Sequence, residues 1–155
     1  MGIFLFSAFV VACSKPALGE SAEKKKESLR TQYLAYFGTS ARGNNNTNGI
    51  FVYRFDARTG KMAEIGLAAD VINPSFISVH PSHKELYAVN TDPAVQGVWS
   101  AFEIDSATGE LIELKHVTSK DSPCLLNVVA TVLMLAVANY HAGSTLSYPI
   151  QENRK

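Results

Sequence analysis

The chain contains short runs in which apolar and polar residues alternate, or in which β-branched and aromatic residues cluster. Runs of this kind, bounded by Gly, Pro, Asn and Asp, are typical of β-strands. The clearest are GIFVYRF at 49–55, KMAEIG at 61–66, PSFISV at 74–79 and ELYAVN at 85–90. An amphipathic helix needs apolar residues three and four positions apart over about a dozen residues, and the sequence lacks that spacing. The pattern therefore predicts an all-β protein.

One decapeptide occurs twice in nearly the same form. FDARTGKMAE occupies residues 55–64, and IDSATGELIE occupies residues 104–113, forty-nine positions further on. In each copy Thr-Gly would make a hairpin turn, because glycine tolerates the positive φ that such turns need. The same offset relates Pro74 to Pro123, and an Asn follows each of them at the same distance. We interpret this recurrence as an internal repeat.

The period of the repeat points to one architecture. Four short strands in 49 residues are typical of one blade of a β-propeller. A β-sandwich, the competing all-β fold, does not predict a constant period. The segment at 33–40 would open the array, two periods follow, and the segment at 144–150 would start a third. We expect a partial β-propeller of four-stranded antiparallel blades.

An incomplete propeller has physical consequences. A closed ring needs at least about four blades, so an array of about two and a half leaves a strand edge and a sheet face uncovered. Uncovered edges pair readily with other strands. We therefore expect self-association, or partner blades that cover the open edge.

The N-terminal region has a different character. An apolar run at 3–12 is too short to span a bilayer but has the length of a signal-peptide core. Small Ala12 precedes Cys13, as at the cleavage site of a bacterial lipoprotein signal. The expected segments are a signal peptide at 1–13, a flexible tether at 14–30 and the incomplete propeller at 31–155.

The signal-peptide interpretation also predicts where the protein is located. Lipidation of Cys13 would tether an exported protein to a membrane, as a periplasmic or cell-envelope lipoprotein. The alternative is that the run at 3–12 is a buried strand or that the start codon lies elsewhere, in which case the protein would be cytoplasmic.

Charge and histidine placement exclude some functions. The 14 basic and 14 acidic side chains cancel, and no basic stripe is present, so we expect no nucleic-acid partner. His80 and His83 flank a Pro-Ser turn and are interpreted as structural, so no metal site is predicted. His116 would be a solvated side chain between strands.

Cys124 is the second cysteine of the chain. It stands between Pro123 and Leu125 with no histidine near it in the sequence. Because a reactive thiol needs a partner that stabilises the thiolate, we expect a buried and unreactive side chain.

Several segments together resemble a known family. They are YFGTS, GIFVYRFDARTGKM, NPSFISVHPSHKELYAVN, VWSAFEIDSATGEL and VANYHAGSTLSYPI, and they lie within residues 33–150. They resemble the lactonase family of seven-bladed β-propellers, whose members include bacterial 6-phosphogluconolactonase. The resemblance implies a hydrolase that acts on a small sugar lactone, such as 6-phosphoglucono-δ-lactone, without a cofactor.

The resemblance also implies where a substrate would bind. In such a propeller the innermost strand of each blade lines a central channel, and the loops at one face form a bowl over it. Amide and hydroxyl groups at that channel mouth suit hydrogen bonding to a polyhydroxy lactone. The substrate-binding candidates are Asn73, Ser75, Asn90, Asn139, Tyr140 and His141. The catalytic residues stay unknown.

The chain departs from the family pattern in the channel. The family has Pro-Cys-His where this chain has Pro123-Cys124-Leu125, so an apolar side chain replaces an imidazole. The family's proposed His, Arg and Glu constellation comes from later blades. The resemblance therefore implies a hydrolase that is impaired in this truncated chain. Two alternatives stay open, namely a non-catalytic binding or scaffold module at the cell envelope and a non-functional fragment.

Overall fold

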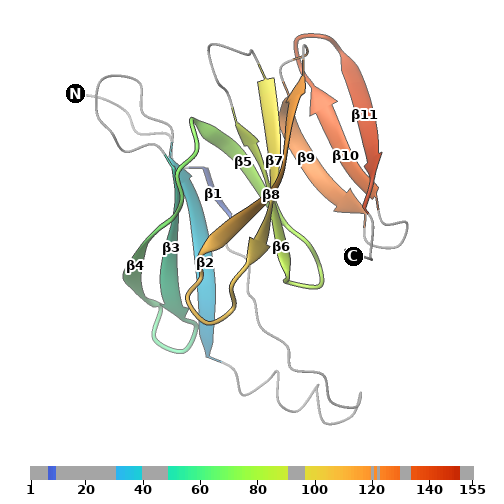
Figure 1. The fold of residues 1–155 in the computed structure, drawn as a ribbon. Helices are drawn as coiled ribbons and strands as arrows, with labels where there is room; N and C mark the ends of the chain where they lie inside the picture. The colour runs from blue at the N-terminus through green and yellow to red at the C-terminus, as the bar shows by residue number, and fades with distance from the viewer. Residues whose placement is uncertain are drawn as a thin grey trace, which may run out of the picture.

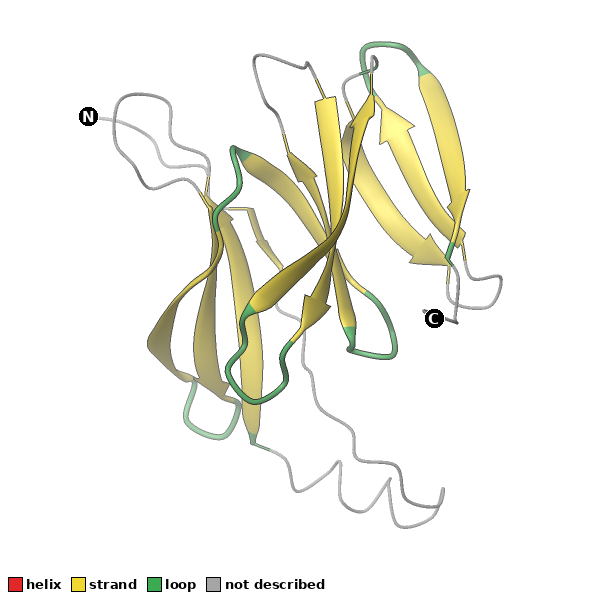
Figure 2. Cartoon of the chain, in the orientation of Figure 1, coloured by secondary structure: helices red, strands yellow, loops and turns green. Residues whose placement is uncertain are grey.

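The computed structural model describes residues 7–9, 31–39, 49–90, 97–119, 121, 123–129 and 134–150. Every regular element in this part of the chain is a β-strand (Figure 2). The strands form three antiparallel sheets that follow one another along the chain (Figure 1). The prediction of an all-β, partial β-propeller is confirmed.

Each sheet is one blade, and its strands pair in the order of the sequence. Blade 1 consists of β1 (Ser7–Phe9), β2 (Gln32–Thr39), β3 (Gly49–Asp56) and β4 (Lys61–Ala69). Blade 2 consists of β5 (Pro74–Val79), β6 (Glu85–Asn90), β7 (Gly97–Ile104) and β8 (Leu111–Ser119). Blade 3 consists of β9 (Pro123–Val129), β10 (Met134–Asn139) and β11 (Ser144–Pro149).

The strands of blades 2 and 3 begin and end at matching positions. β5 starts at Pro74 and β9 at Pro123, while β6 ends at Asn90 and β10 at Asn139. The apolar segment between the start of β9 and the end of β10 forms these two strands. The strand predicted at 33–40 lies at 32–39.

β1 is an addition to the sequence-based picture. Ser7–Phe9 lies within the predicted signal peptide and pairs antiparallel with Tyr36–Gly38 of β2. It therefore holds the place in blade 1 that β5 holds in blade 2. Cys13 and the predicted tether at 14–30 lie outside the described residues. No helix in the described part of the chain is long and apolar enough to cross a membrane.

The second strand of blade 2 explains how the blades hold together. Side chains alternate between the two faces of a strand. Leu86 and Ala88 of β6 face blade 1, whereas Tyr87 and Val89 face blade 3, and all four are buried. A strand covered on both faces must be apolar at nearly every position, and burial of that apolar surface is the main force that joins the blades.

Two separate cores result, one at each junction between blades. The core between blades 1 and 2 contains Leu34, Tyr36, Ile50, Val52, Ala68, Ile77, Leu86, Ala88, Phe102, Ile104 and Leu111. The core between blades 2 and 3 contains Tyr87, Val89, Trp99, Ala101, Leu126, Leu135 and Val137.

The two Thr-Gly hairpins have the same internal hydrogen bonds. The Oδ1 atom of Asp56 accepts from the backbone N–H groups of Arg58 and Thr59, at 2.8 and 3.3 Å. Asp105 does the same for the residues two and three positions after it, also at 2.8 and 3.3 Å. The glycines that follow have φ values of 70° and 85°. The decapeptide therefore encodes one local structure twice.

Candidate functional site

The predicted site residues lie along one rim of the blades. This rim is where β6 and β10 end and where β5 and β9 begin, drawn at the top of Figure 1. β5 contacts both β1 and β9, so the inner strands of successive blades lie next to one another. The backbones approach closely there, since a Cβ atom added to Gly38 would lie 2.5 Å from the carbonyl oxygen of Pro74.

The candidates divide into an exposed set and a buried set. Ser75, Tyr140 and His141 are exposed, and Asn73 is half-buried with a φ of 46°. The exposed fraction of Tyr140 is 79%. The remaining two, Asn90 and Asn139, are 5% and 1% exposed, so their amides lie inside the blades.

The exposed aromatic pair of blade 3 sits on a tight turn. Tyr140 and His141 follow β10, and their rings meet edge to face with centroids 5.6 Å apart. The backbone N–H of Gly143 donates to the carbonyl of Tyr140 at 3.3 Å, and Gly143 has a φ of 59°. Asn139 links the two ends of this turn, because its Nδ2 atom donates to Ser144 Oγ at 3.1 Å. The buried amide thus positions the exposed pair.

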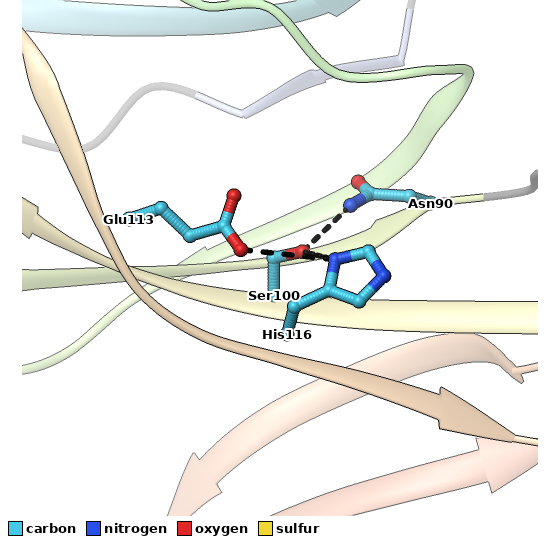
Figure 3. A network of polar contacts seen from close by, with 4 residues as sticks. All are labelled: Asn90, Ser100, Glu113 and His116. Atoms are coloured by element: carbon cyan, nitrogen blue, oxygen red, sulfur yellow. Dashed lines mark hydrogen bonds and ion pairs between the residues drawn. The ribbon is translucent and has the colours of Figure 1, made fainter.

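The equivalent asparagine of blade 2 belongs to a larger polar network (Figure 3). The Nδ2 atom of Asn90 donates to Ser100 Oγ at 2.9 Å, and this oxygen lies 3.4 Å from His116 Nδ1. The same imidazole nitrogen lies 3.8 Å from Glu113 Oε1. The amide oxygens of Asn90 and Asn139 have no hydrogen-bond partner among the described atoms. Within the described part of the chain, each amide is therefore held through its nitrogen.

The network does not have the geometry of a nucleophilic triad. In such a triad the serine and the acid contact different nitrogens of the imidazole. Here Ser100 and Glu113 both approach Nδ1 of His116, and Ser100 is fully buried, so a substrate carbonyl has no access to its hydroxyl. We interpret the network as a brace that holds Asn90 at the rim.

Sequence reasoning missed this brace. His116 was expected as a solvated side chain between strands, but it lies within β8 and is half-exposed beside Ser100. The two residues meet only because β7 and β8 pair with Ser100 opposite His116. Sixteen residues separate them, and the sequence carries no motif that joins them.

The expectation of a buried Cys124 is wrong. The thiol is exposed, and its Sγ atom lies 3.4 Å from the carbonyl oxygen of Ala138. The register of β9 against β10 shifts here, since Ala138 pairs with Leu125 and Asn139 pairs with Pro123. Cys124 is therefore an extra, unpaired residue of a bulge. Leu125, in the position where the family resemblance implies an imidazole, is 45% exposed.

The described residues contain no group of three or more His, Cys, Asp or Glu side chains that could hold a metal ion. Among the described residues, the predicted candidates at the rim offer the imidazole of His141, the phenol of Tyr140, the hydroxyl of Ser75 and the half-buried amide of Asn73. Imidazole suits proton transfer near neutral pH, and the other groups suit hydrogen bonding to a polar ligand. Proton transfer and hydrogen bonding are therefore the kinds of chemistry that these side chains can supply.

Comparison with known proteins agrees with this fold. The family model described as "Lactonase, 7-bladed beta-propeller" matches residues 34–155. A 6-phosphogluconolactonase of Bacillus subtilis is 32% identical over 124 residues, which cover 79% of this chain and 35% of that protein. A 6-phosphogluconolactonase of Formosa agariphila is 30% identical over 69% of this chain and 31% of its own length.

A solved structure shows the same likeness in three dimensions. The periplasmic gluconolactonase of Pseudomonas aeruginosa superposes with a TM-score of 0.65 at 26% identity. The match covers 78% of this chain and 35% of that protein. The chain therefore spans about a third of the length of the relatives that it matches.

Proposed function

Because the chain belongs to the lactonase family of seven-bladed β-propellers, we propose that it supplies part of an enzyme that hydrolyses a sugar lactone. The relatives named 6-phosphogluconolactonase and gluconolactonase support this reaction class. They favour a polyhydroxy lactone such as 6-phosphoglucono-δ-lactone as the substrate. The chain contributes the rim of blades 2 and 3 to the binding surface.

Lactone hydrolysis needs a base and a surface that holds the ring. Water attacks the carbonyl carbon, the ring C–O bond breaks, and the ring oxygen receives a proton. In our proposal His141 takes the proton of the attacking water and returns it to the leaving oxygen. Tyr140 offers an exposed ring against the sugar, and Ser75 and Asn73 bind its hydroxyl groups.

The buried asparagines act through other residues in this proposal. Asn139 holds the turn that carries Tyr140 and His141, through its hydrogen bond to Ser144. Asn90 holds the corresponding end of β6. Both are therefore positioning residues, in contrast to the expectation from the resemblance that they bind the substrate directly. The single observation that carries the proposal is the exposed Tyr140–His141 pair on a braced turn.

The test measures the rate at which glucono-δ-lactone and its 6-phosphate are hydrolysed. The rate is recorded as base uptake at constant pH and is compared with the rate of the spontaneous reaction. We expect a rate above background, and we expect His141→Gln to lower kcat by about a hundredfold, as loss of a general base does. Tyr140→Ala should raise KM with a smaller effect on kcat. The matched control is Asn127→Gln, a change of an exposed residue in β9. Equal rates for the wild type and His141→Gln would refute the assigned role.

A non-catalytic sugar-binding module is the second candidate, and Leu125 favours it. An apolar side chain stands where the family carries an imidazole, and it is 45% exposed. This candidate predicts that the lactone, or its hydrolysed acid, binds with an affinity that Tyr140→Ala weakens, while the hydrolysis rate stays at background. Calorimetric titration beside the rate measurement separates the two candidates.

A further inference from the structure

The brace around Asn90 connects the outer strand of blade 2 to the rim. Figure 3 shows the amide nitrogen of Asn90 turned toward Ser100, and Nδ2 donates to Ser100 Oγ at 2.9 Å. Because the Ser100 oxygen accepts from the amide, its own proton is left to donate to Nδ1 of His116, 3.4 Å away. Both hydrogen bonds of the brace therefore point from the rim toward the imidazole.

The propeller fold does not require polar side chains at these positions. Ser100 lies two residues after the β7 residue that pairs with the end of β6. Counted in the same way, the residue is Phe51 in blade 1 and Leu146 in blade 3. Blade 1 has Leu67 opposite Phe51, where blade 2 has His116 opposite Ser100. Since burial of a polar group costs free energy, the polar side chains of blade 2 indicate a role beyond packing.

The brace ends beside a residue that is proposed to bind substrate. Ser75 Oγ donates to the carbonyl oxygen of Val89 at 3.4 Å. This carbonyl and the backbone N–H of Asn90 belong to one planar peptide unit, so a firmly held Asn90 fixes the direction of the carbonyl. A register shift places Ser75 between the paired residues Pro74 and Phe76, and the bond to the carbonyl orients its hydroxyl.

We propose that His116 and Ser100 are positioning residues, which act through Asn90 to orient the Ser75 hydroxyl toward a substrate at the rim. This inference rests on the proposed function, in which Ser75 binds a hydroxyl group of the lactone. It assigns the protonation state of an imidazole on the outer strand a direct effect on the binding surface.

Protonation of His116 reverses the brace. A protonated Nδ1 can only donate, so the Ser100 oxygen accepts from it and the Ser100 proton needs a new acceptor. The amide oxygen of Asn90 is buried and has no other partner among the described atoms. The amide turns over to accept that proton, and the peptide unit that holds Ser75 moves with it.

The charged groups around His116 are few on this face of blade 2. Glu113 Oε1 lies 3.8 Å from Nδ1 and stabilises the protonated imidazole. β8 packs against β7 and β4, and the β7 residues on either side of Ser100 on this face are apolar. By strand alternation Lys61 of β4 is on the side of blade 1 that faces blade 2, and Glu64 is on the other side. Lys115 lies opposite Ala101 and faces blade 3.

NMR of the full chain tests the brace without reference to activity. The side-chain amide signals of Asn90 are assigned by their loss in Asn90→Asp. We expect these signals and the backbone amide signal of Ser75 to shift together between about pH 8 and about pH 5, the range in which imidazoles change charge. His116→Asn keeps an acceptor near the position of Nδ1 but does not titrate. It should match the wild type at the higher pH and abolish the shift.

The matched control is Lys115→Asn, a change on the opposite face of β8, which should leave the shift intact. Asn90 signals that do not change with pH in the wild type would overturn the proposal. A pH response that survives in His116→Asn, or a Ser75 signal that does not follow the Asn90 signals, would overturn it as well.

Kinetics on glucono-δ-lactone slightly above neutral pH test the consequence for binding. His116→Leu should raise KM about fivefold with little change in kcat, because it loosens one hydrogen-bonding contact to the substrate. His116→Asn should restore the KM of the wild type. Because both residues act on one contact, His116→Leu should add nothing in a Ser75→Ala background.

The kinetic and NMR results separate the two proposals. A KM effect of His116→Leu that persists in full in the Ser75→Ala background would refute the action through Ser75. If the chain hydrolyses no lactone while the expected NMR shifts appear, the proposed function fails and the positioning of Ser75 by His116 is supported.

Discussion

Asp105 shows how one side chain can organise a turn. Its carboxylate accepts hydrogen bonds from the backbone N–H groups of Ala107 and Thr108, at 2.8 and 3.3 Å. These bonds favour the ionised form and hold the pKa of Asp105 below its usual value of 3.8. The turn is therefore stabilised by a charge that acid removes.

This pKa gives the turn a pH dependence. Because the folded pKa is the lower one, the stabilisation is complete above the unfolded pKa and is lost as the pH falls through the folded value. We predict that Asp105→Asn lowers the free energy of unfolding at pH 7, and that the gap to the wild type narrows as the pH falls below the usual carboxyl pKa of 3.8. Urea unfolding at pH 7 and at a series of lower pH values measures the gap, with Asp70→Asn as the control. A gap that stays constant with pH would contradict the assignment.

At the scale of elements, the two Thr-Gly hairpins share a sequence pattern but differ in their surroundings. Both glycines have positive φ, which costs a residue with a side chain about 1 kcal/mol or more. A Cβ atom at Gly60 would meet open space, whereas one at Gly109 would lie 2.9 Å from Val52. A side chain at Gly60 would therefore cost backbone strain alone, whereas one at Gly109 would cost backbone strain and a steric clash.

We predict that Gly60→Ala lowers the free energy of unfolding by about 1 kcal/mol. Gly109→Ala should cost about 2–4 kcal/mol, because overpacking against blade 1 adds to the same strain. Thermal or urea unfolding of the two variants in parallel measures the difference. Equal losses would show that the hairpin of Gly109 does not bear on blade 1 in solution.

At the scale of the whole molecule, stability depends on the junctions between blades. The middle strands of a blade are buried on a face only where a neighbouring blade covers that face. In β6, for example, Leu86 is buried against blade 1 and Tyr87 against blade 3. A blade alone would leave these side chains in water. Neighbouring blades should therefore unfold together, as in other repeat arrays.

The hydroxyl of Tyr36 tests one junction directly. It is buried and donates to Gly109 of the next blade. We predict that Tyr36→Phe lowers the free energy of unfolding by about 1–2 kcal/mol, because a buried carbonyl loses its donor. Tyr140→Phe, which alters an exposed phenol, should change it by less than about 0.5 kcal/mol. Similar effects of the two changes on urea unfolding would argue against this bond between the blades.

Much of the fold could be predicted because its signals are local. Alternation of side chains identifies strands, and the Asp-x-x-Thr-Gly pattern identifies turns whose hydrogen bonds span two or three residues. The matching starts of β5 and β9 at Pro74 and Pro123 agree with the offset read from the sequence. The candidate site was predictable to the level of the rim, since strand ends follow from strand positions.

The side-chain contacts of the site could not be predicted in this way. The exposure of Cys124 depends on a bulge between β9 and β10, and the brace around Asn90 depends on the register of β7 against β8. Both are properties of pairs of strands. The burial of Asn90 and Asn139 likewise follows from how the blades cover the ends of β6 and β10.

The amino-acid sequence by itself determined the strands, the turns and the family of this protein, because those depend on residues a few positions apart. The tertiary structure alone decided which side chains reach solvent at the rim and which hairpin packs on the neighbouring blade. These outcomes depend on strand register and on the packing of one blade against the next. Contacts between distant segments set both, and short sequence patterns do not encode them.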